Sequence, residues 1–170
     1  MSGDEKEQLL DNVGPCSLLC YTCPAFMRGI IPELSNKLIN YFEGYYDFQV
    51  ENFPEEYKSR AEVTREFIKN LSGYTQPKCE GCRNKEDSVT KIRGCFILRC
   101  SIEQGVDFCG ECSMFPCEKV DTNLFNPTLY ERWVRGNRRI REVGVAQFFE
   151  EEKRKSHYID FLKDANVQKY

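Results

Sequence analysis

Ten cysteines are the feature that most limits how this chain of 170 residues can fold. A compact group lies near the N-terminus and a longer series follows, with only a few residues between many of the neighbours. Thiols gathered in this way are either cross-linked as disulfides or bound to metal, and the cellular compartment separates the two cases. The ten are Cys16, Cys20, Cys23, Cys79, Cys82, Cys95, Cys100, Cys109, Cys112 and Cys117.

The compartment is indicated by the rest of the sequence. Residues 1–11 are polar and acidic, the opposite of the basic and then apolar pattern of a signal peptide. No stretch approaches the roughly 20 apolar residues that span a bilayer, so we expect no membrane segment. A net charge of −3 gives no bulk attraction to nucleic acid or anionic membranes. We therefore expect a cytoplasmic protein with metal-bound cysteines, and a secreted disulfide scaffold is the alternative.

Two pairs of cysteines have the spacing of zinc ligands. They are Cys79-Glu80-Gly81-Cys82 and Cys109-Gly110-Glu111-Cys112. A gap of two residues lets both thiolates of one tight turn reach the same ion, and the tetrahedral preference of zinc then requires a second pair. We expect these two pairs to form one closed structural zinc site. The remaining cysteines of this region, Cys95, Cys100 and Cys117, are expected ligands without an assigned partner.

The three N-terminal cysteines have the spacing of a different kind of metal site. Cys16, Cys20 and Cys23 form C-x3-C-x2-C, the spacing that holds the cluster in radical S-adenosylmethionine enzymes. Those enzymes need a large partial barrel, which a short and mostly helical chain does not provide. Three thiolates with an open fourth position can still hold an iron–sulfur cluster with a redox or catalytic role, which is the alternative to zinc. Dithiol redox chemistry is a weaker alternative, because the strand–helix setting of a thioredoxin-like site is missing.

The periodicity of apolar residues predicts a mainly α-helical fold with little or no sheet. Leu34, Leu38, Tyr41 and Tyr45 share one face of a helix expected over 29–46. A second helix over 54–71 should pack against it as an antiparallel hairpin, with its aromatic residues in the core. We expect a single domain, 1–170, made of a cysteine-rich region at 14–120 and a helical extension at 121–170.

Capping residues place the helices of the second half of the chain. A short helix is expected from Cys95 to Glu103, ended by Gly105. Asn126 and Pro127 suit the N-cap and the first position of another helix. Gly144 should break that helix, which then continues over 145–155.

The cysteine motifs resemble those of an uncharacterised family known as domain of unknown function 3795. Its motifs are similar to Cys-Gly-Leu-x-Cys-x-x-Cys-Pro-Ala-Tyr, Cys-x-Gly-Cys, Cys-x-Ile-Arg-x-Cys and Cys-x-x-Cys-x-x-Phe-Pro-Cys. The chain has Cys16-Ser17-Leu18-Leu19-Cys20-Tyr21-Thr22-Cys23-Pro24-Ala25-Phe26, Cys79-Glu80-Gly81-Cys82, Cys95-Phe96-Ile97-Leu98-Arg99-Cys100 and Cys109-Gly110-Glu111-Cys112-Ser113-Met114-Phe115-Pro116-Cys117. The resemblance covers about 14–120, and 138–144 is similar to longer members. Ser17 stands in place of Gly, and Arg99 is shifted by one position. The resemblance implies metal binding, with zinc as the usual assignment. It does not indicate which activity the protein has.

A cluster of arginines offers a second candidate surface. Arg132, Arg135, Arg138 and Arg139 lie on or beside one face of a helix and could bind the phosphates of a nucleotide or nucleic acid. The alternative is a solvated basic face balanced by the acids at 150–152. His157 is far from every cysteine in sequence, so we expect it to be a surface residue and the metal ligands to be all thiolate. No motif assigns an enzymatic activity.

Overall fold

The computed structural model describes residues 3–83, 95–118, 120 and 126–161. These residues are mainly helical and contain no β-strand, as predicted. Segment 84–94 of the cysteine-rich region and the two ends of the extension, 121–125 and 162–170, lie outside the described residues. The helices are α1 (Gly3–Asn12), α2 (Ile30–Phe42), α3 (Tyr45–Asn52), α4 (Lys58–Ser72), α5 (Phe96–Glu103) and α6 (Pro127–Glu152).

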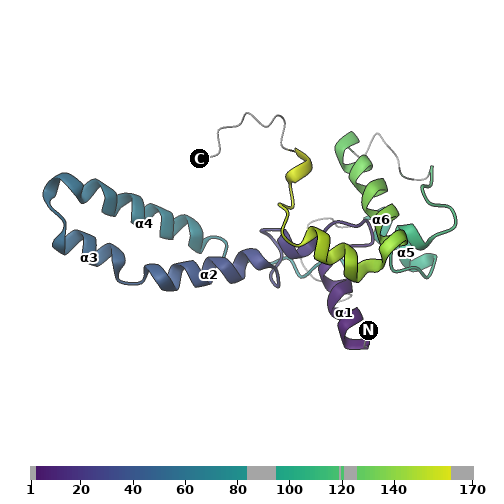
Figure 1. Cartoon of the computed structure of the whole chain (residues 1–170), viewed down its shortest axis with the longest axis horizontal. Helices are drawn as coiled ribbons and strands as arrows, with labels where there is room; N and C mark the ends of the chain where they lie inside the picture. The colour runs from purple at the N-terminus through teal and green to yellow at the C-terminus, as the bar shows by residue number, and fades with distance from the viewer. Residues whose placement is uncertain (1–2, 84–94, 119, 121–125, 162–170) are drawn as a thin grey trace.

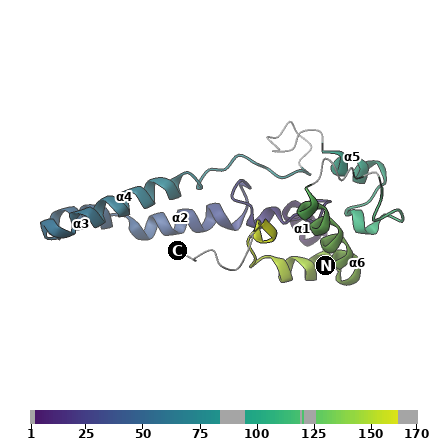
Figure 2. The same ribbon diagram turned by 90° about the horizontal axis from the view of Figure 1, so that it is seen from above.

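Helices α2, α3 and α4 form an arm that extends away from the rest of the molecule (Figures 1 and 2). Helix α4 returns along α3 and α2, which confirms the predicted helical hairpin. The single helix predicted over 29–46 is wrong in its extent. Helix α2 ends at Phe42, and Gly44 takes a left-handed φ of 74° before α3 begins. Glycine reaches this conformation without steric cost, so the local backbone favoured a break over continuation.

The aromatic residues of the arm are less buried than the hairpin prediction implied. Ala61 and Thr64 are buried on α4, and the Phe42 and Phe67 rings pack with centroids 5.3 Å apart. Tyr41, however, is 85% exposed, and Leu34 and Leu38 are also exposed. The arm has no second layer of helices packed against it. Each helix therefore buries only a narrow stripe of side chains, and the other apolar residues remain exposed to solvent.

Helix α6 is the longest helix at the end of the molecule opposite the arm. It starts as predicted, because the Asn126 side chain accepts a hydrogen bond of 2.9 Å from Thr128 N and Pro127 follows in the first turn. The predicted break is also confirmed, since Gly144 has a φ of 80° and ψ of 162° inside the helix. The chain turns sharply there, and the two parts of α6 meet at an angle (Figure 1).

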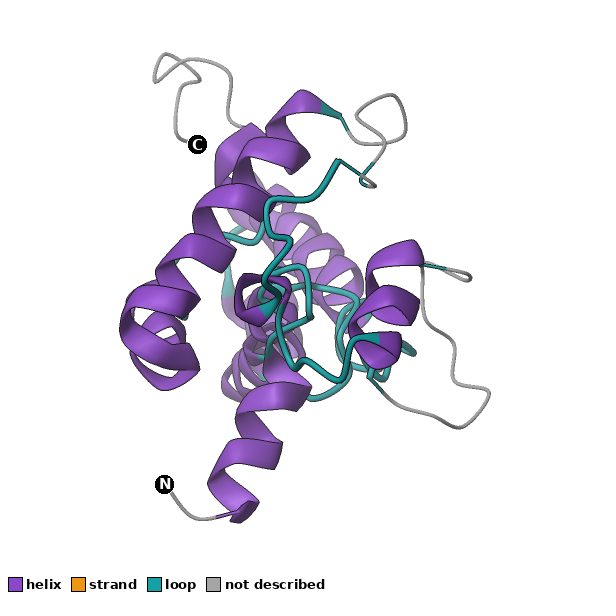
Figure 3. Ribbon diagram, turned by 90° about the vertical axis from the view of Figure 1, so that its right-hand side faces the viewer, coloured by secondary structure: helices purple, strands orange, loops and turns teal. Residues whose placement is uncertain are grey.

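Loops fill the middle of this end of the molecule, with helices around them (Figure 3). Two small apolar clusters support these loops. One contains Val13, Leu19, Phe108, Ile140 and Phe148, and the other contains Ile97, Phe115, Val120 and Trp133. Helix α6 contributes to both clusters, so it joins the N-terminal loop to the later cysteine loops.

No helix among the described residues combines the length and the apolar character that crossing a membrane requires.

Candidate metal centre

Cysteines from distant parts of the chain line one cavity of about 240 Å³. Backbone pairing brings the two segments together. Cys79 N donates to Ala25 O over 3.0 Å, and Met27 N donates to Cys79 O over 2.9 Å. The segment after the N-terminal cysteines therefore lies alongside the Cys79 turn. The cysteines that line the cavity, called the cavity set below, are Cys16, Cys20, Cys23, Cys79, Cys82 and Cys95.

Glycines allow these sulfur atoms to approach one another. A β-carbon on Gly14 would stand 3.4 Å from both Cys16 Sγ and Cys82 Sγ, so these two thiols face the same backbone position. Gly81 has a left-handed φ of 93°, and a β-carbon there would meet the Phe26 ring at 3.2 Å. The glycine just before Cys82 is therefore required by both backbone conformation and space.

Burial controls the charge state of the cavity thiols. It raises the pKa of Cys16 to about 12, and the neighbouring Cys82 adds to this effect. Burial also raises the pKa of Cys20 and of Cys82, while the Arg83 guanidinium acts in the opposite direction on Cys82. These thiols are therefore neutral near pH 7 in the metal-free chain. A bound cation would supply the charge that their thiolate forms lack.

A second set of thiols surrounds Cys109. Burial raises the pKa of Cys109 to about 11, the Trp133 indole N–H acts against this rise, and Cys117, Cys100 and Cys112 add to it. Trp133 Nε1 is buried without a formed hydrogen bond among the described residues. An N–H in this position can stabilise a thiolate. The second set, called the Trp133 set below, is Cys100, Cys109, Cys112 and Cys117.

Helix α6 holds the turn that carries Cys109 and Cys112. Asn137 is fully buried, and its Oδ1 accepts a hydrogen bond of 2.8 Å from Gly110 N. Arg141 donates to the backbone oxygens of Gly110 and of Cys112, the latter over 2.9 Å. A β-carbon on Gly110 would overlap the backbone of Asn137. Sequence reasoning missed Asn137 and the supporting role of Arg141, and Gly110 inside the cysteine pair was the available signal.

The structure shows which cysteines lie near one another, and the expected pairing stays a prediction. We expected Cys79 and Cys82 to share a site with Cys109 and Cys112. Backbone pairing instead brings the first pair to the N-terminal group, and the second pair lies with Cys100 and Cys117. The two sets adjoin, because Cys109 N donates to Pro15 O over 3.1 Å. All ten cysteines are free thiols. No three Cys, His, Asp or Glu side chains of the described residues are placed to hold a metal ion, so closing either set on an ion would require thiol side chains to rotate.

His157 does not lie where the sequence suggested. It is half-buried and lines the same cavity as Cys20 and Cys23, although more than a hundred residues separate them in sequence. Its Nδ1 lies 2.8 Å from Leu19 O. The next residue, Tyr158, lines the same cavity, where burial and then the neighbouring Cys23 raise the pKa of its hydroxyl group. The expectation of an ordinary surface histidine is therefore wrong, because the chain after α6 returns to the cysteine loops.

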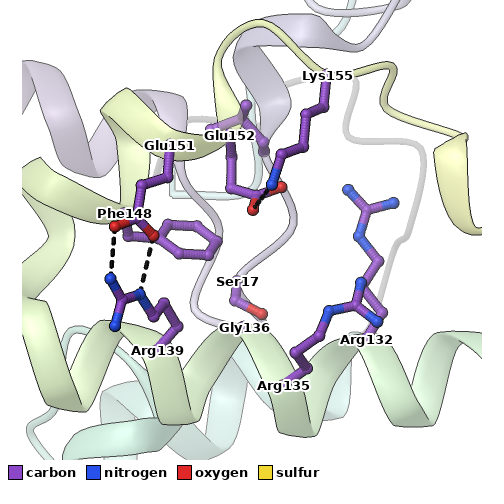
Figure 4. A pocket seen from close by; sticks show the side chains of 10 residues that line it. Ser17, Arg132, Arg135, Gly136, Arg139, Phe148, Glu151, Glu152 and Lys155 are labelled. Carbon is purple, nitrogen blue, oxygen red and sulfur yellow. Dashed lines mark hydrogen bonds and ion pairs between the residues drawn. The ribbon is translucent and has the colours of Figure 1, made fainter.

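The arginines of α6 are largely occupied by acids of the same chain. Arg139 makes a two-pronged contact with Glu151, at 2.9 and 2.6 Å, and Figure 4 shows this pair on one side of a cleft that Arg132 and Arg135 also line. Arg135 binds Asp160 at 2.7 Å. Arg132 lies 3.5 Å from the same carboxylate and also donates to the backbone oxygen of His157.

Arg138 is the exception, since it has no ion pair within the part of the chain that the structure describes. A phosphate at Arg132, Arg135 or Arg139 would have to displace carboxylates that already bind there.

Comparison with known protein families gives one match. The model of the family DUF3795, described as a protein of unknown function, matches residues 12–122. The chain belongs to this family. No curated protein and no solved structure matches the sequence. The DUF3795 match contains all ten cysteines. Trp133, Asn137, Arg141 and His157 lie beyond it, so the helical extension supplies the groups that support the family's cysteine loops.

Proposed function

We propose that this DUF3795 protein binds zinc through cysteine thiolates and that the metal fixes a structural or interaction module. The observation that carries the proposal is the gathering of ten free cysteines into two adjoining sets. Thiolates are soft ligands that select zinc, copper(I) and iron–sulfur clusters, and zinc accepts four of them in a tetrahedron.

The Trp133 set is the proposed closed structural site. Cys100, Cys109, Cys112 and Cys117 supply the four ligands that tetrahedral zinc takes. The Trp133 N–H and the backbone around Gly110, held by α6, provide the outer contacts that orient such ligands. Structural zinc contributes roughly 10–16 kcal/mol of apparent binding energy. That energy supports a loop whose only regular structure between α5 and residue 118 is one short 3-10 turn, Cys109–Glu111.

An iron–sulfur cluster in the cavity set is the second candidate. The observation that favours it is the cavity itself, about 240 Å³ and lined by thiols. A single ion enclosed by four thiolates leaves little open space, whereas a cluster of several iron and sulfide atoms fills a larger volume. Cys16, Cys20 and Cys23 would supply its ligands, as their spacing suggested.

We also propose a cytoplasmic location. All ten cysteines are free in the structure, and free thiols persist in a reducing compartment. Free thiols are also the form that zinc and iron–sulfur clusters require.

The deciding experiment is metal analysis of the untagged full-length protein purified without oxygen. The proposal predicts a colourless protein with stoichiometric zinc. Cys112→Ser should lose the zinc of the Trp133 set, because it removes one thiolate of that set, whereas the exposed neighbour Ser113→Ala should retain it. A brown protein containing iron and sulfide in place of zinc would instead support the second candidate. A metal-free protein that binds neither metal on reconstitution would overturn both.

A further inference from the structure

One wall of the cysteine cavity is built by the C-terminal segment. His157 and Tyr158 line the cavity together with cysteines of both contributing loops, among them Cys20, Cys23 and Cys79. These two residues lie beyond the DUF3795 match and directly after α6. The cavity set therefore has one imidazole beside its thiols, and this is the single histidine of the chain.

One nitrogen of the His157 ring makes the kind of contact that metal-binding histidines make. Its Nδ1 lies 2.8 Å from the backbone oxygen of Leu19, which can only accept a hydrogen bond. Nδ1 therefore carries the proton, and the neutral ring has its lone pair on Nε2. Metal-binding histidines use this arrangement, since the bond from one ring nitrogen to a carbonyl fixes the tautomer and directs the other nitrogen.

The segment that carries His157 is anchored at the cavity. Arg132, whose side chain is 11% exposed, donates to the backbone oxygen of His157 and pairs with Asp160. Arg135 holds the same carboxylate at 2.7 Å. Tyr158 also lines the cavity, and its ring centroid lies 4.7 Å from that of His157. Arg132 and Arg135 thus hold the segment 157–160 beside the thiols.

We propose that His157 is a nitrogen ligand of the metal bound in the cysteine cavity, so that this site is a mixed sulfur–nitrogen site while the Trp133 set is all sulfur. The inference rests on the proposed function and names one further ligand of it. Three thiolates and one neutral imidazole around Zn²⁺ carry a net charge of −1, whereas four thiolates carry −2. The smaller net charge costs less to enclose away from water. Three cysteines and one histidine are an established zinc ligand set.

The test uses the wild-type protein and needs no substitution. The untagged full chain, produced with isotope-labelled histidine, is loaded with zinc for X-ray absorption and with NMR-active cadmium for metal–nitrogen coupling. Because His157 is the only histidine, any imidazole bound to metal is His157. We expect a nitrogen shell at about 2.0–2.1 Å beside the sulfur shell at about 2.3 Å, and a coupling between cadmium and the labelled ring.

Variants then measure the effect on affinity. His157→Gln should weaken the cavity metal at least about 100-fold, more than the 10–100-fold typical of outer contacts, and should remove the nitrogen shell. Tyr41→Phe, a change at an exposed residue of the arm far from the cavity, should retain the nitrogen shell. An all-sulfur environment in the wild-type protein with metal bound would overturn the assignment of His157 and leave thiolate binding intact. A wild-type chain that binds neither zinc nor cadmium would overturn the proposed function itself.

Discussion

Ser17 and Gly136 lie against each other where the N-terminal cysteine loop meets α6. A β-carbon on Gly136 would overlap Ser17 Oγ and stand 2.7 Å from Ser17 Cβ. Ser17 has a left-handed φ of 61°, a conformation that favours glycine, the residue that the family motif has at this position. One turn of α6 thus places the cavity set beside Gly136 and the Trp133 set beside Asn137.

This contact predicts a rescue between the two positions. Gly136→Ala should lower the free energy of unfolding by about 1–3 kcal/mol, as overpacking does. Ser17→Gly removes the two side-chain atoms that the new methyl group would meet and relieves a left-handed backbone that costs a non-glycine residue about 1–2 kcal/mol. The double variant should therefore recover most of the loss in denaturant unfolding measured at equal metal content. If the effects of the two single substitutions simply added in the double variant, the two residues would not touch.

The Asn137 bond to the cysteine turn predicts a large effect from a small change. Asn137→Ala leaves Gly110 N buried without its acceptor, which should cost about 1–3 kcal/mol of stability. The affinity of the Trp133 set for metal should also fall about 10–100-fold. Asn36→Ala is a matched control, because Asn36 also donates to the carbonyl four residues earlier, but on the exposed face of the arm. An equal effect of both substitutions on metal release would contradict the role of Asn137.

The indole N–H of Trp133 can be removed alone. Trp133→Phe keeps an aromatic ring against Phe115, whose centroid lies 4.9 Å away, but loses the N–H that lowers the pKa of Cys109. We expect zinc affinity at the Trp133 set to fall about tenfold or more. Competition with a chromophoric chelator measures this, and Tyr130→Phe, beside the same ring, should change nothing. If Trp133→Phe retained wild-type affinity, the N–H would have no part in binding metal.

The pair that joins the two parts of α6 predicts a dependence on acid pH. The Arg139 guanidinium lowers the pKa of Glu151 from 4.5 to about 2, and Gln147 assists. A carboxyl with a lowered pKa stabilises the folded state above pH 4.5, and that stabilisation disappears as the pH falls towards 2. Glu151→Gln should therefore melt at a lower temperature than wild type at neutral pH, with the difference closing near pH 2. Glu150→Gln, which removes only a pair within one helical turn, should show a much smaller difference.

Metal loss at acid pH affects all three proteins alike, so only the difference between the variants is informative. A difference between Glu151→Gln and wild type that stayed constant from pH 7 to pH 2 would contradict the ion pair.

Local features of the structure could be read from the sequence because their causes are local. Asn126 and Pro127 begin α6, and Gly144 breaks it, since each effect depends on one residue and its immediate neighbours. The hairpin of the arm follows from apolar periodicity in the same way. Gly44 was the exception, because its left-handed break competed with a helical pattern that continued on both sides.

The sequence by itself determined that the fold is mainly helical, where α6 begins and breaks, and which ten residues are the candidate metal ligands. Only the tertiary structure shows which thiols lie near one another. The backbone hydrogen bonds of Ala25 and Met27 with Cys79 join segments that are far apart in the sequence. The tertiary structure also brought His157 to Cys23 across the length of the chain. The spacing of the cysteines limits which of them can share one turn. Contacts between different turns depend on how the helices pack. Helix α6 makes these contacts through two adjacent residues, Gly136 against the N-terminal loop and Asn137 against the Cys109 turn.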